Sequence, residues 1–534
     1  MNMTVKRLVR SVAVAAGVSA FVLAAGPAHA ETFVVGAGED YETVEDGLAA
    51  ASAGDTVLVR RGTYDVAQLR PGSGVTLISE EGPVHTKLFA SAGGQALMIE
   101  GVSDVRVEGF DIYSELSIGP RTNALVYVEN ATDVYIGDCY LHDAPNDADI
   151  LKMNDTQRLV LEDSVLYNPG ARSTSEGFQE CIDIRGTGDD SITVRGSWLF
   201  HEAGQGDYLL YAKGGTTNLL WENNIFGPSA GEDPANVPVE TGHLGRTDAG
   251  TDYESESFVV RNNLLVGIRG TGAFAFAGPR IALLYNNVFY RNQDIRRSLI
   301  ELSANPAEAG GPGVDLFSLN NIFYDNGDRT IYRVRDVPSG AGLTRDYNLY
   351  ETGADGGDLD ITDEANSRTA DDPLFIDPAV PLFDPAAGTA QIQAILRGFE
   401  TQEGSPARGV GTDVFALAGA VHPSAIADMT NRLDAFGTPR PAGTWDMGLF
   451  QSCDGPCAPR PDGGVDPDGG VDPDGGTPDG GPSDGGGGSD SGAPDAGSGG
   501  ESGGCGCSVH RDGEPVGLLF IALLGALLLR RRLI

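Results

Sequence analysis

Nine short segments of one pattern recur along the middle of the chain. Each alternates apolar and polar residues, several contain Asn-Asn before an apolar residue, and no helical periodicity separates them. The apolar residue that follows the asparagine or its equivalent recurs every 24 to 39 residues, at Ile112, Leu141, Leu166, Leu199, Ile225, Leu264, Val288, Ile322 and Leu349. Such a repeat is typical of a solenoid whose coils each contribute short strands. We therefore predict an all-β fold, a right-handed parallel β-helix.

Equivalent positions of the repeat carry the same type of residue, as expected when coils stack about 4.8 Å apart. The clearest column consists of asparagines, at Asn224, Asn263, Asn287, Asn321 and Asn348. Stacked asparagines can satisfy one another's amide groups where the chain turns between strands. We predict a structural role for this column.

Both ends of the repeat differ from its middle. Thr43 and Asp46 have capping-box spacing at the start of a helical segment, and this helix is expected to cover the first coil. From Asp371 the repeat loosens into a run that ends in TPRPAGTWDMGLF. This run resembles the closing segment of secreted β-helix proteins of the pectin-lyase-like superfamily, and the resemblance extends from Thr32 to about Phe450. It implies the fold and leaves the chemistry open.

The ends of the chain predict export. Residues 1–30 run from a basic start through an apolar stretch to Ala-His-Ala, the pattern of a signal peptide. The β-helix domain would then occupy 31–451. Residues 452–504 form a Pro/Gly/Asp-rich repeat, which predicts a disordered linker because it can bury little apolar surface. The chain has 76 acidic and 36 basic residues, so we expect no nucleic-acid partner.

Residues 505–534 contain a Cys-Gly-Cys motif, an apolar run and three arginines. The apolar run would form a helix of about 21 Å, short for a hydrocarbon core of about 30 Å. This order resembles the MYXO-CTERM sorting segments of myxobacterial surface proteins. The resemblance implies that a processing enzyme recognises Cys505 and Cys507 and that the protein reaches the cell surface, in the outer membrane or outside it. An ordinary C-terminal membrane anchor is the alternative, and we expect a monomer.

The other cysteines do not make a disulfide framework in a chain of this length. Cys453 and Cys457 are close enough in sequence to form a disulfide bond, whereas Cys139 and Cys181 lie at different phases of the repeat. The pairing of all four stays open.

Three consecutive coils predict a column of cations on the outer face. Counting back from the ends of these coils aligns Lys152, Arg185 and Lys213, with Asp183 and Tyr211 two residues earlier on the same face. Like charges stacked about 5 Å apart repel each other. The column therefore predicts an anionic partner such as an acidic polysaccharide. The alternative is that neighbouring acids, Asp183 among them, pair with the cations.

The longest interval, 39 residues, follows the coil of Lys213. An insertion in a solenoid leaves the stack as a loop, usually on the binding face. This loop carries Glu240, His243, Arg246 and Asp248, and His201 and Asp207 precede Lys213 on the other side. We expect these polar groups to converge around Lys213, with His243 contacting the substrate.

A lyase reaction is one interpretation of this site. β-Elimination from a uronate needs a cation or metal at the carboxylate, a base and a proton donor. The residues resemble the lysine-plus-arginine arrangement of alginate and chondroitin lyases with a β-helix fold, which implies Lys213 as base, Arg246 as acid and calcium as a candidate metal. Those families have Arg-His-Gly where this chain has His-Leu-Gly-Arg, and their calcium-binding acid pair has no counterpart at matching positions. Metal use therefore stays open.

Two other functions remain as alternatives. Gly188-Asp189-Asp190 and Gly242-His243 faintly resemble polygalacturonase motifs, but the Arg-Ile-Lys motif is missing, and both aspartates occupy a position where the coil needs a turn. A non-enzymatic glycan-binding or adhesion protein is the third hypothesis. The sequence leaves open whether the chain is an enzyme.

Overall fold

The computed structural model describes residues 29–452, except for the segments 92–93, 115–122, 146, 171–178, 187–189, 203–207, 230–238, 242–253, 304–314, 328–329, 336–341, 355–358 and 422–431. The chain divides into two compact units, Met1–Gly464 and Val465–Ile534, and the second lies wholly outside the described residues. Residues 1–28 of the predicted signal peptide and nearly all of the linker also lie outside them, as do the predicted C-terminal helix and Cys453, Cys457, Cys505 and Cys507. Within the described residues, no helix is long and apolar enough to cross a membrane.

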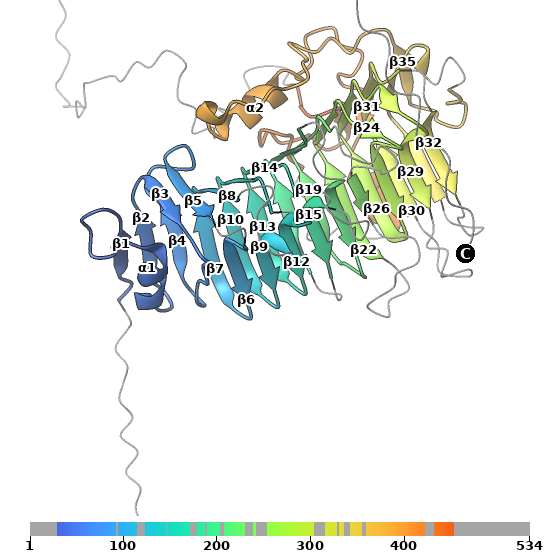
Figure 1. Ribbon diagram of the computed structural model, residues 1–534. Helices are drawn as coiled ribbons and strands as arrows, with labels where there is room; N and C mark the ends of the chain where they lie inside the picture. The colour runs from blue at the N-terminus through green and yellow to red at the C-terminus, as the bar shows by residue number, and fades with distance from the viewer. Residues whose placement is uncertain are drawn as a thin grey trace, which may run out of the picture. The chain divides into compact units, whose positions relative to one another are not determined.

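The first unit is a right-handed parallel β-helix with three long sheets, as the repeat predicted (Figure 1). Each complete coil adds one strand to sheet A, then one to sheet B and one to sheet C. Sheet A contains, in spatial order, β1 (Thr32–Val35), β2 (Thr56–Val59), β4 (Thr76–Ser79), β7 (Ser103–Glu108), β10 (Thr132–Gly137), β13 (Gln157–Glu162), β16 (Thr193–Arg195), β19 (Leu219–Glu222), β22 (Ser255–Arg261), β26 (Pro279–Tyr285), β30 (Asp315–Leu319) and β33 (Gly342–Asp346).

Sheets B and C complete each coil, and every neighbouring pair of strands in the three sheets is parallel. Sheet B contains β3 (Gly62–Asp65), β5 (Thr86–Ala90), β8 (Asp111–Ser114), β11 (Tyr140–His142), β14 (Val165–Tyr167), β17 (Trp198–Phe200), β20 (Ile225–Phe226), β23 (Leu264–Val266), β27 (Val288–Tyr290), β31 (Ile322–Tyr324), β34 (Leu349–Glu351) and β35 (Arg368–Ala370). Sheet C contains β6 (Leu97–Glu100), β9 (Ala124–Glu129), β12 (Asp149–Asn154), β15 (Glu180–Arg185), β18 (Tyr208–Lys213), β21 (Val239–Thr241), β25 (Phe274–Ala277), β29 (Ser298–Ser303) and β32 (Thr330–Arg335).

The asparagine column turns the chain between sheets A and B. The side-chain oxygen of Asn287 accepts the backbone N–H of Asn263 at 2.9 Å, and the backbone N–H of Asn287 in turn donates to the side-chain oxygen of Asn321. The same bond recurs at the other predicted asparagines, and Ser164 and Ser197 continue the column through their hydroxyl oxygens. All of these side chains are fully buried. The predicted structural role is confirmed.

The register of sheet B corrects the sequence alignment by one residue. Ile225 pairs with Trp198, and Leu199 pairs with Phe226, because Ser197 is the equivalent of Asn224. A shift of one residue moves a side chain to the other face of a strand. The first four aligned positions therefore belong to the interior core, whereas the last five belong to a second apolar cluster outside the coil, under the closing segment.

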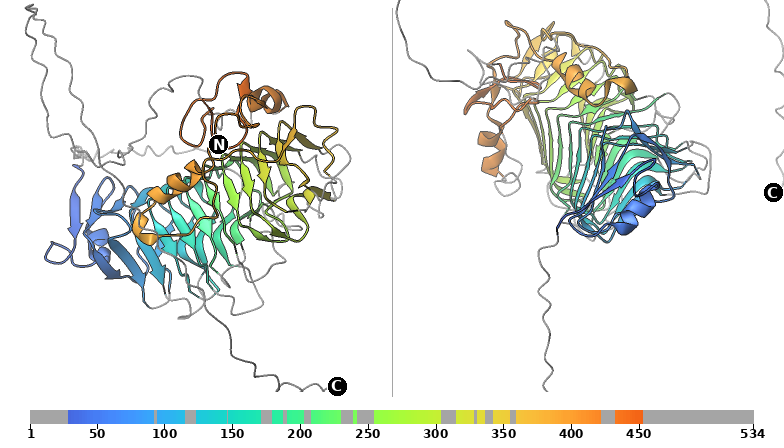
Figure 2. Two further views of the ribbon diagram at one scale, coloured as in Figure 1. Left: turned by 90° about the horizontal axis from the view of Figure 1, so that it is seen from above. Right: turned by 90° about the vertical axis from the view of Figure 1, so that its left-hand side faces the viewer.

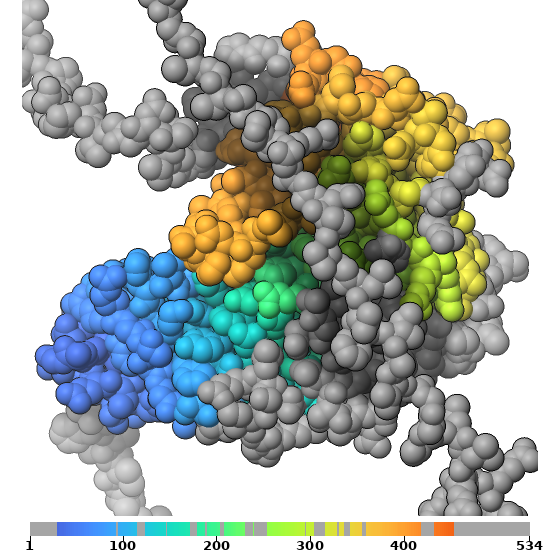
Figure 3. Space-filling model, turned by 45° about the horizontal axis from the view of Figure 1, so that its top comes forward, coloured from blue at the N-terminus to red at the C-terminus, as the bar shows by residue number. Residues whose placement is uncertain are grey.

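The ends of the β-helix are covered. Helix α1 (Val44–Ala50) begins at Thr43, whose hydroxyl accepts the backbone N–H of Asp46, and it packs against β1 and β2, as predicted (Figure 2). After β35 the chain runs back along the outside of sheet B through α2 (Ala390–Arg397) (Figure 3). The remaining elements are the 3-10 helix η3 (Pro385–Ala387), α3 (Val414–Val421) and the short strands β24 (Arg269–Gly270), β28 (Asp294–Ile295), β36 (Gly411–Thr412) and β37 (Thr444–Trp445).

Candidate functional site

The register of sheet C corrects the predicted cation column. Arg185 lies opposite Lys213, as expected, but Lys152 lies opposite Asp183, and Asn154 lies opposite Arg185. The turn from sheet C to sheet A is two residues longer after β15 than after β12, so counting back from the end of each coil displaced Lys152 by two positions. The structure therefore does not stack the three predicted cations in one column.

Lys152, Asp183 and Lys213 form one chain of ion pairs on the outer face of sheet C. Lys213 Nζ lies 2.8 Å from Asp183 Oδ1. Lys152 Nζ contacts the other oxygen of the same carboxylate and lies 2.9 Å from Asp149 Oδ2. Asp183 is 1% exposed, whereas the side chains of Lys152 and Lys213 are 23% and 18% exposed. The pairing of these cations with acids, one of the two predicted interpretations, is thus what the structure shows.

Three carboxylates gather below the two lysines. Asp149, Glu180 and Asp183 are all buried, and one oxygen of each lies within 4.8 Å of the others. Burial and the neighbouring Asp149 carboxylate raise the pKa of Glu180 well above its usual value. Burial also opposes the charge of Asp183, but Lys213 and Lys152 outweigh it and hold the pKa of Asp183 below its usual value. The acidic cluster is defined here as these three residues.

Sequence reasoning missed Glu180. Asp149 and Lys152 are three residues apart, as are Glu180 and Asp183 in the next coil. In the structure Asp149 is the equivalent of Glu180, and Lys152 is the equivalent of Asp183. Aligning acid with acid, instead of lysine with arginine, would have given the observed register and brought Glu180 into the site.

The acidic cluster is the group of described residues that suits a hard cation, because Ca²⁺ prefers carboxylate oxygens. However, the Lys152 ammonium already contacts two of the three carboxylates. A calcium ion among these oxygens would have to displace Lys152. The residues as arranged do not fit a resident divalent ion.

Tyr211 and two glycines shape the surroundings of Lys213. The Lys213 ammonium lies 4.3 Å from the centre of the Tyr211 ring, and Tyr211 stacks on Tyr208 with ring centres 4.9 Å apart. Gly214 and Gly215 both have positive φ, which favours glycine. A Cβ on Gly214 would also lie 3.2 Å from Cγ of Arg185. The glycines therefore turn the chain and leave room for the Arg185 side chain, which is exposed.

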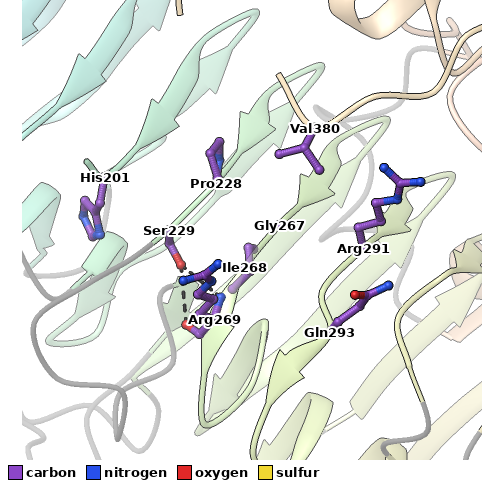
Figure 4. A pocket seen from close by; sticks show the side chains of 9 residues that line it. All are labelled: His201, Pro228, Ser229, Gly267, Ile268, Arg269, Arg291, Gln293 and Val380. Carbon is purple, nitrogen blue, oxygen red and sulfur yellow. Dashed lines mark hydrogen bonds between the residues drawn. The ribbon is translucent and has the colours of Figure 1, made fainter. Parts of the chain in front are cut away.

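A separate cavity of about 330 Å³ is lined by residues that follow strands of sheet B, such as His201, Pro228 and Gly267 (Figure 4). His201 lines it and donates from Nε2 to the Tyr208 carbonyl oxygen at 3.1 Å. Burial lowers the pKa of His201 to about 4, so the imidazole is neutral at neutral pH. Arg269 and Arg291 also line it, and Arg291 forms an ion pair with Asp325. His201 therefore bonds to the backbone of Tyr208, the first residue of β18, and its convergence with Lys213 stays a prediction.

The structure gives partial information on the other predicted residues. Asp190 is buried, and its carboxylate accepts the backbone N–H of Thr217 at 2.9 Å, which supports the predicted turn role. Glu240 belongs to β21 and lies opposite Tyr211. The remaining candidates lie outside the described residues, at Asp189, Asp207, His243, Arg246 and Asp248. Their roles stay predictions.

Comparisons with solved structures found several distant similarities. The chain is similar to an alginate lyase from Paenibacillus sp. str. FPU-7 (16% identity, TM-score 0.37, 57% of this chain and 99% of that one) and to pectate lyase Pel9A (11% identity, TM-score 0.46, 79% and 96%). It is also similar to the surface adhesin PfbA of Streptococcus pneumoniae (12% identity, TM-score 0.35, 57% and 92%). No protein-family model matches the chain, and no curated protein matches it in sequence.

Proposed function

We propose that the outer face of sheet C around Arg185 and Lys213 binds an acidic polysaccharide and that Lys213 is the base of a β-elimination. The observation that carries the proposal is the arrangement of charge. Arg185 and Lys213 are neighbours in one column, and the buried carboxylate that contacts Lys213 is shared with Lys152. The column thus places two cations side by side on a chain of net charge −40.

The chemistry assigns one task to each cation. Arg185 would bind the uronate carboxylate, and its guanidinium suits a planar carboxylate. Lys213 would take the proton from the carbon next to that carboxylate, after which the electron pair forms a C=C bond and expels the glycosidic oxygen. That oxygen needs a proton from an acid, which the sequence resemblance assigns to Arg246. Removal of a positioned base typically costs 10²-fold to 10⁴-fold in rate.

One contact favours a second candidate, a glycan-binding protein without cleavage. Lys213 Nζ lies 2.8 Å from Asp183 Oδ1, so the group that would act as the base already forms an ion pair. In a binding protein this same pair would hold the ammonium in place for an anionic sugar. Both candidate functions use the same surface, and they differ only in whether the bound polysaccharide is cleaved.

The full chain can be tested on alginate, pectate and chondroitin sulfate, with dextran as an uncharged control. A lyase produces unsaturated ends that absorb ultraviolet light, and a binding protein produces none. We expect wild type to cleave one acidic polymer and Lys213→Ala to cleave it at a rate lower by about 10²-fold or more. Arg185→Ala should bind that polymer more weakly, and the difference should be most evident at low salt.

Lys87→Ala is the matched control, because Lys87 also pairs with a buried aspartate, Asp111, but on sheet B. This variant should keep wild-type binding and cleavage. Binding without unsaturated products would favour the second candidate. If wild type and Arg185→Ala bind every polymer equally, the proposed surface is wrong.

A further inference from the structure

We infer that the Lys152 ammonium is the resident cation of the acidic cluster, so that this site is built without calcium or any other divalent ion. Lys152 then acts as a positioning residue. It holds Asp183, and Asp183 holds Lys213. The inference concerns the ion content of the cluster and holds whether or not the polysaccharide is cleaved.

The position of the ammonium is the first argument. Lys152 Nζ lies 2.9 Å from Asp149 Oδ2 and bonds to Asp183 Oδ2, so it lies between two of the three carboxylates. Oxygen ligands lie 2.3 to 2.6 Å from a Ca²⁺ ion, which places them within about 5 Å of one another. The three carboxylates have that spacing, with an oxygen of each within 4.8 Å. The ammonium therefore lies within a group of oxygens of the size that a calcium ion would gather.

The bonds of the cluster are the second argument. Both oxygens of Asp183 contact lysines, and Asp149 uses Oδ1 to accept the backbone N–H of Glu180 at 3.1 Å and Oδ2 to bind Lys152. Calcium takes six to eight oxygen ligands. Four carboxylate oxygens already have donors, and displacing Lys152 would leave an ammonium to be paired elsewhere on the surface.

The strand register is the third argument. Lys152 has Tyr127 on one side in sheet C and Asp183 on the other. The β-helix thus places Lys152 beside Asp183 of the next coil, while its ammonium also reaches Asp149 in its own coil. A residue with no charge at this position would leave two buried aspartates without their shared cation, and such buried charges are costly.

Calcium titration of the full chain tests the inference. We expect the melting temperature of wild type to show no saturable response to millimolar Ca²⁺. Lys152→Met keeps the apolar stem and removes the charge. This variant should melt lower than wild type without calcium, gain several degrees on saturation with calcium, and bind one ion by isothermal titration calorimetry. The restoration by an ion is a response that a merely structural loss would not give.

Two further variants control the experiment. Lys87→Met removes the lysine that pairs with Asp111 on sheet B, and it should gain no calcium site. Lys152→Met combined with Asp183→Asn should lose the site again. If Lys152→Met does not fold, the calcium titrations of Lys152→Gln and of wild type test the inference instead.

Three results would overturn the inference. One is a wild-type protein that binds calcium and loses it in Asp183→Asn. Another is a folded Lys152→Met or Lys152→Gln that binds no ion, and the third is a Lys87→Met control that binds one as well. None of these results depends on a polysaccharide. They can therefore be told apart from a failure of the proposed reaction, which would appear as an absence of unsaturated products.

Discussion

His142 lies in a stack of rings on the outer face of sheet B. Its ring lies between those of Tyr113 and Tyr167, with ring centres 5.2 and 4.6 Å away. Asp111 and Asp143 each accept a hydrogen bond of 2.8 Å from one ring nitrogen, which requires the doubly protonated imidazolium. Burial opposes this charge, but the two aspartates outweigh it and raise the pKa of His142 to about 9.

This pKa predicts how stability depends on pH. A histidine whose pKa is higher in the folded state stabilises the protein fully below its unfolded pKa, about 6.5, and loses that contribution as the pH rises to about 9. The shift corresponds to about 3 kcal/mol. We expect the free energy of unfolding to fall over this interval in wild type and to change much less in His142→Gln, as measured by denaturant unfolding. Equal slopes in the two proteins would contradict the assigned ion pairs.

At the scale of elements, the turns and the closing segment carry much of the organisation. A second short column, Asn292 and Asn326, turns the chain after sheet B, since the backbone N–H of Asn292 donates to Asn326 Oδ1 at 3.1 Å. The closing segment then covers the outward side chains of sheet B. Phe383 reaches four rings there, with centres 5.1 to 5.7 Å away, at Tyr140, Tyr167, Trp198 and Phe200.

Phe383 and its neighbour Leu382 give a matched pair for this element. Phe383→Ala removes the ring from its four contacts, and we expect a loss of about 2 to 3 kcal/mol in the free energy of unfolding. Leu382 is 89% exposed, so Leu382→Ala should change it by less than about 0.5 kcal/mol. Denaturant unfolding of both variants measures the difference. Equal effects would mean that the segment does not hold sheet B through this ring.

At the scale of the molecule, the folded unit ends in a tightly bound segment. The buried guanidinium of Arg440 donates to the carbonyl oxygens of Gly448 and Leu449, and Asn286 donates to the carbonyl oxygen of Asp446. These contacts fasten the last residues before the predicted linker to the β-helix. The start of the linker at residue 452 stays a prediction from composition.

A deletion tests this boundary. Removal of residues 462–500 takes out most of the Pro/Gly/Asp repeat, and we expect no change in the melting temperature of the β-helix, because the repeat has little apolar surface to bury. Truncation after residue 443 is the control. It removes Trp445 and the partners of Arg440, and should lower the melting temperature by several degrees. A lower melting temperature in the linker deletion would contradict the predicted boundary.

The sequence by itself determined the coil, the asparagine column and the capping helix. Each depends on short-range pattern, because alternation sets the face of a strand and stacking repeats one residue type in every coil. The sequence also singled out Lys152, Asp183, Tyr211 and Lys213, which the structure brings together.

Only the tertiary structure decided which of these residues touch. The turns between sheets differ in length from coil to coil, so the alignment of one sheet does not give the register of another. For this reason the sequence alignment paired Lys152 with Arg185, whereas in the structure Lys152 lies opposite Asp183. The fold then decided the ionisation, since burial and the neighbouring Asp149 carboxylate raise the pKa of Glu180. The covering of sheet B joins residues more than 200 positions apart, and no local pattern encodes such a contact.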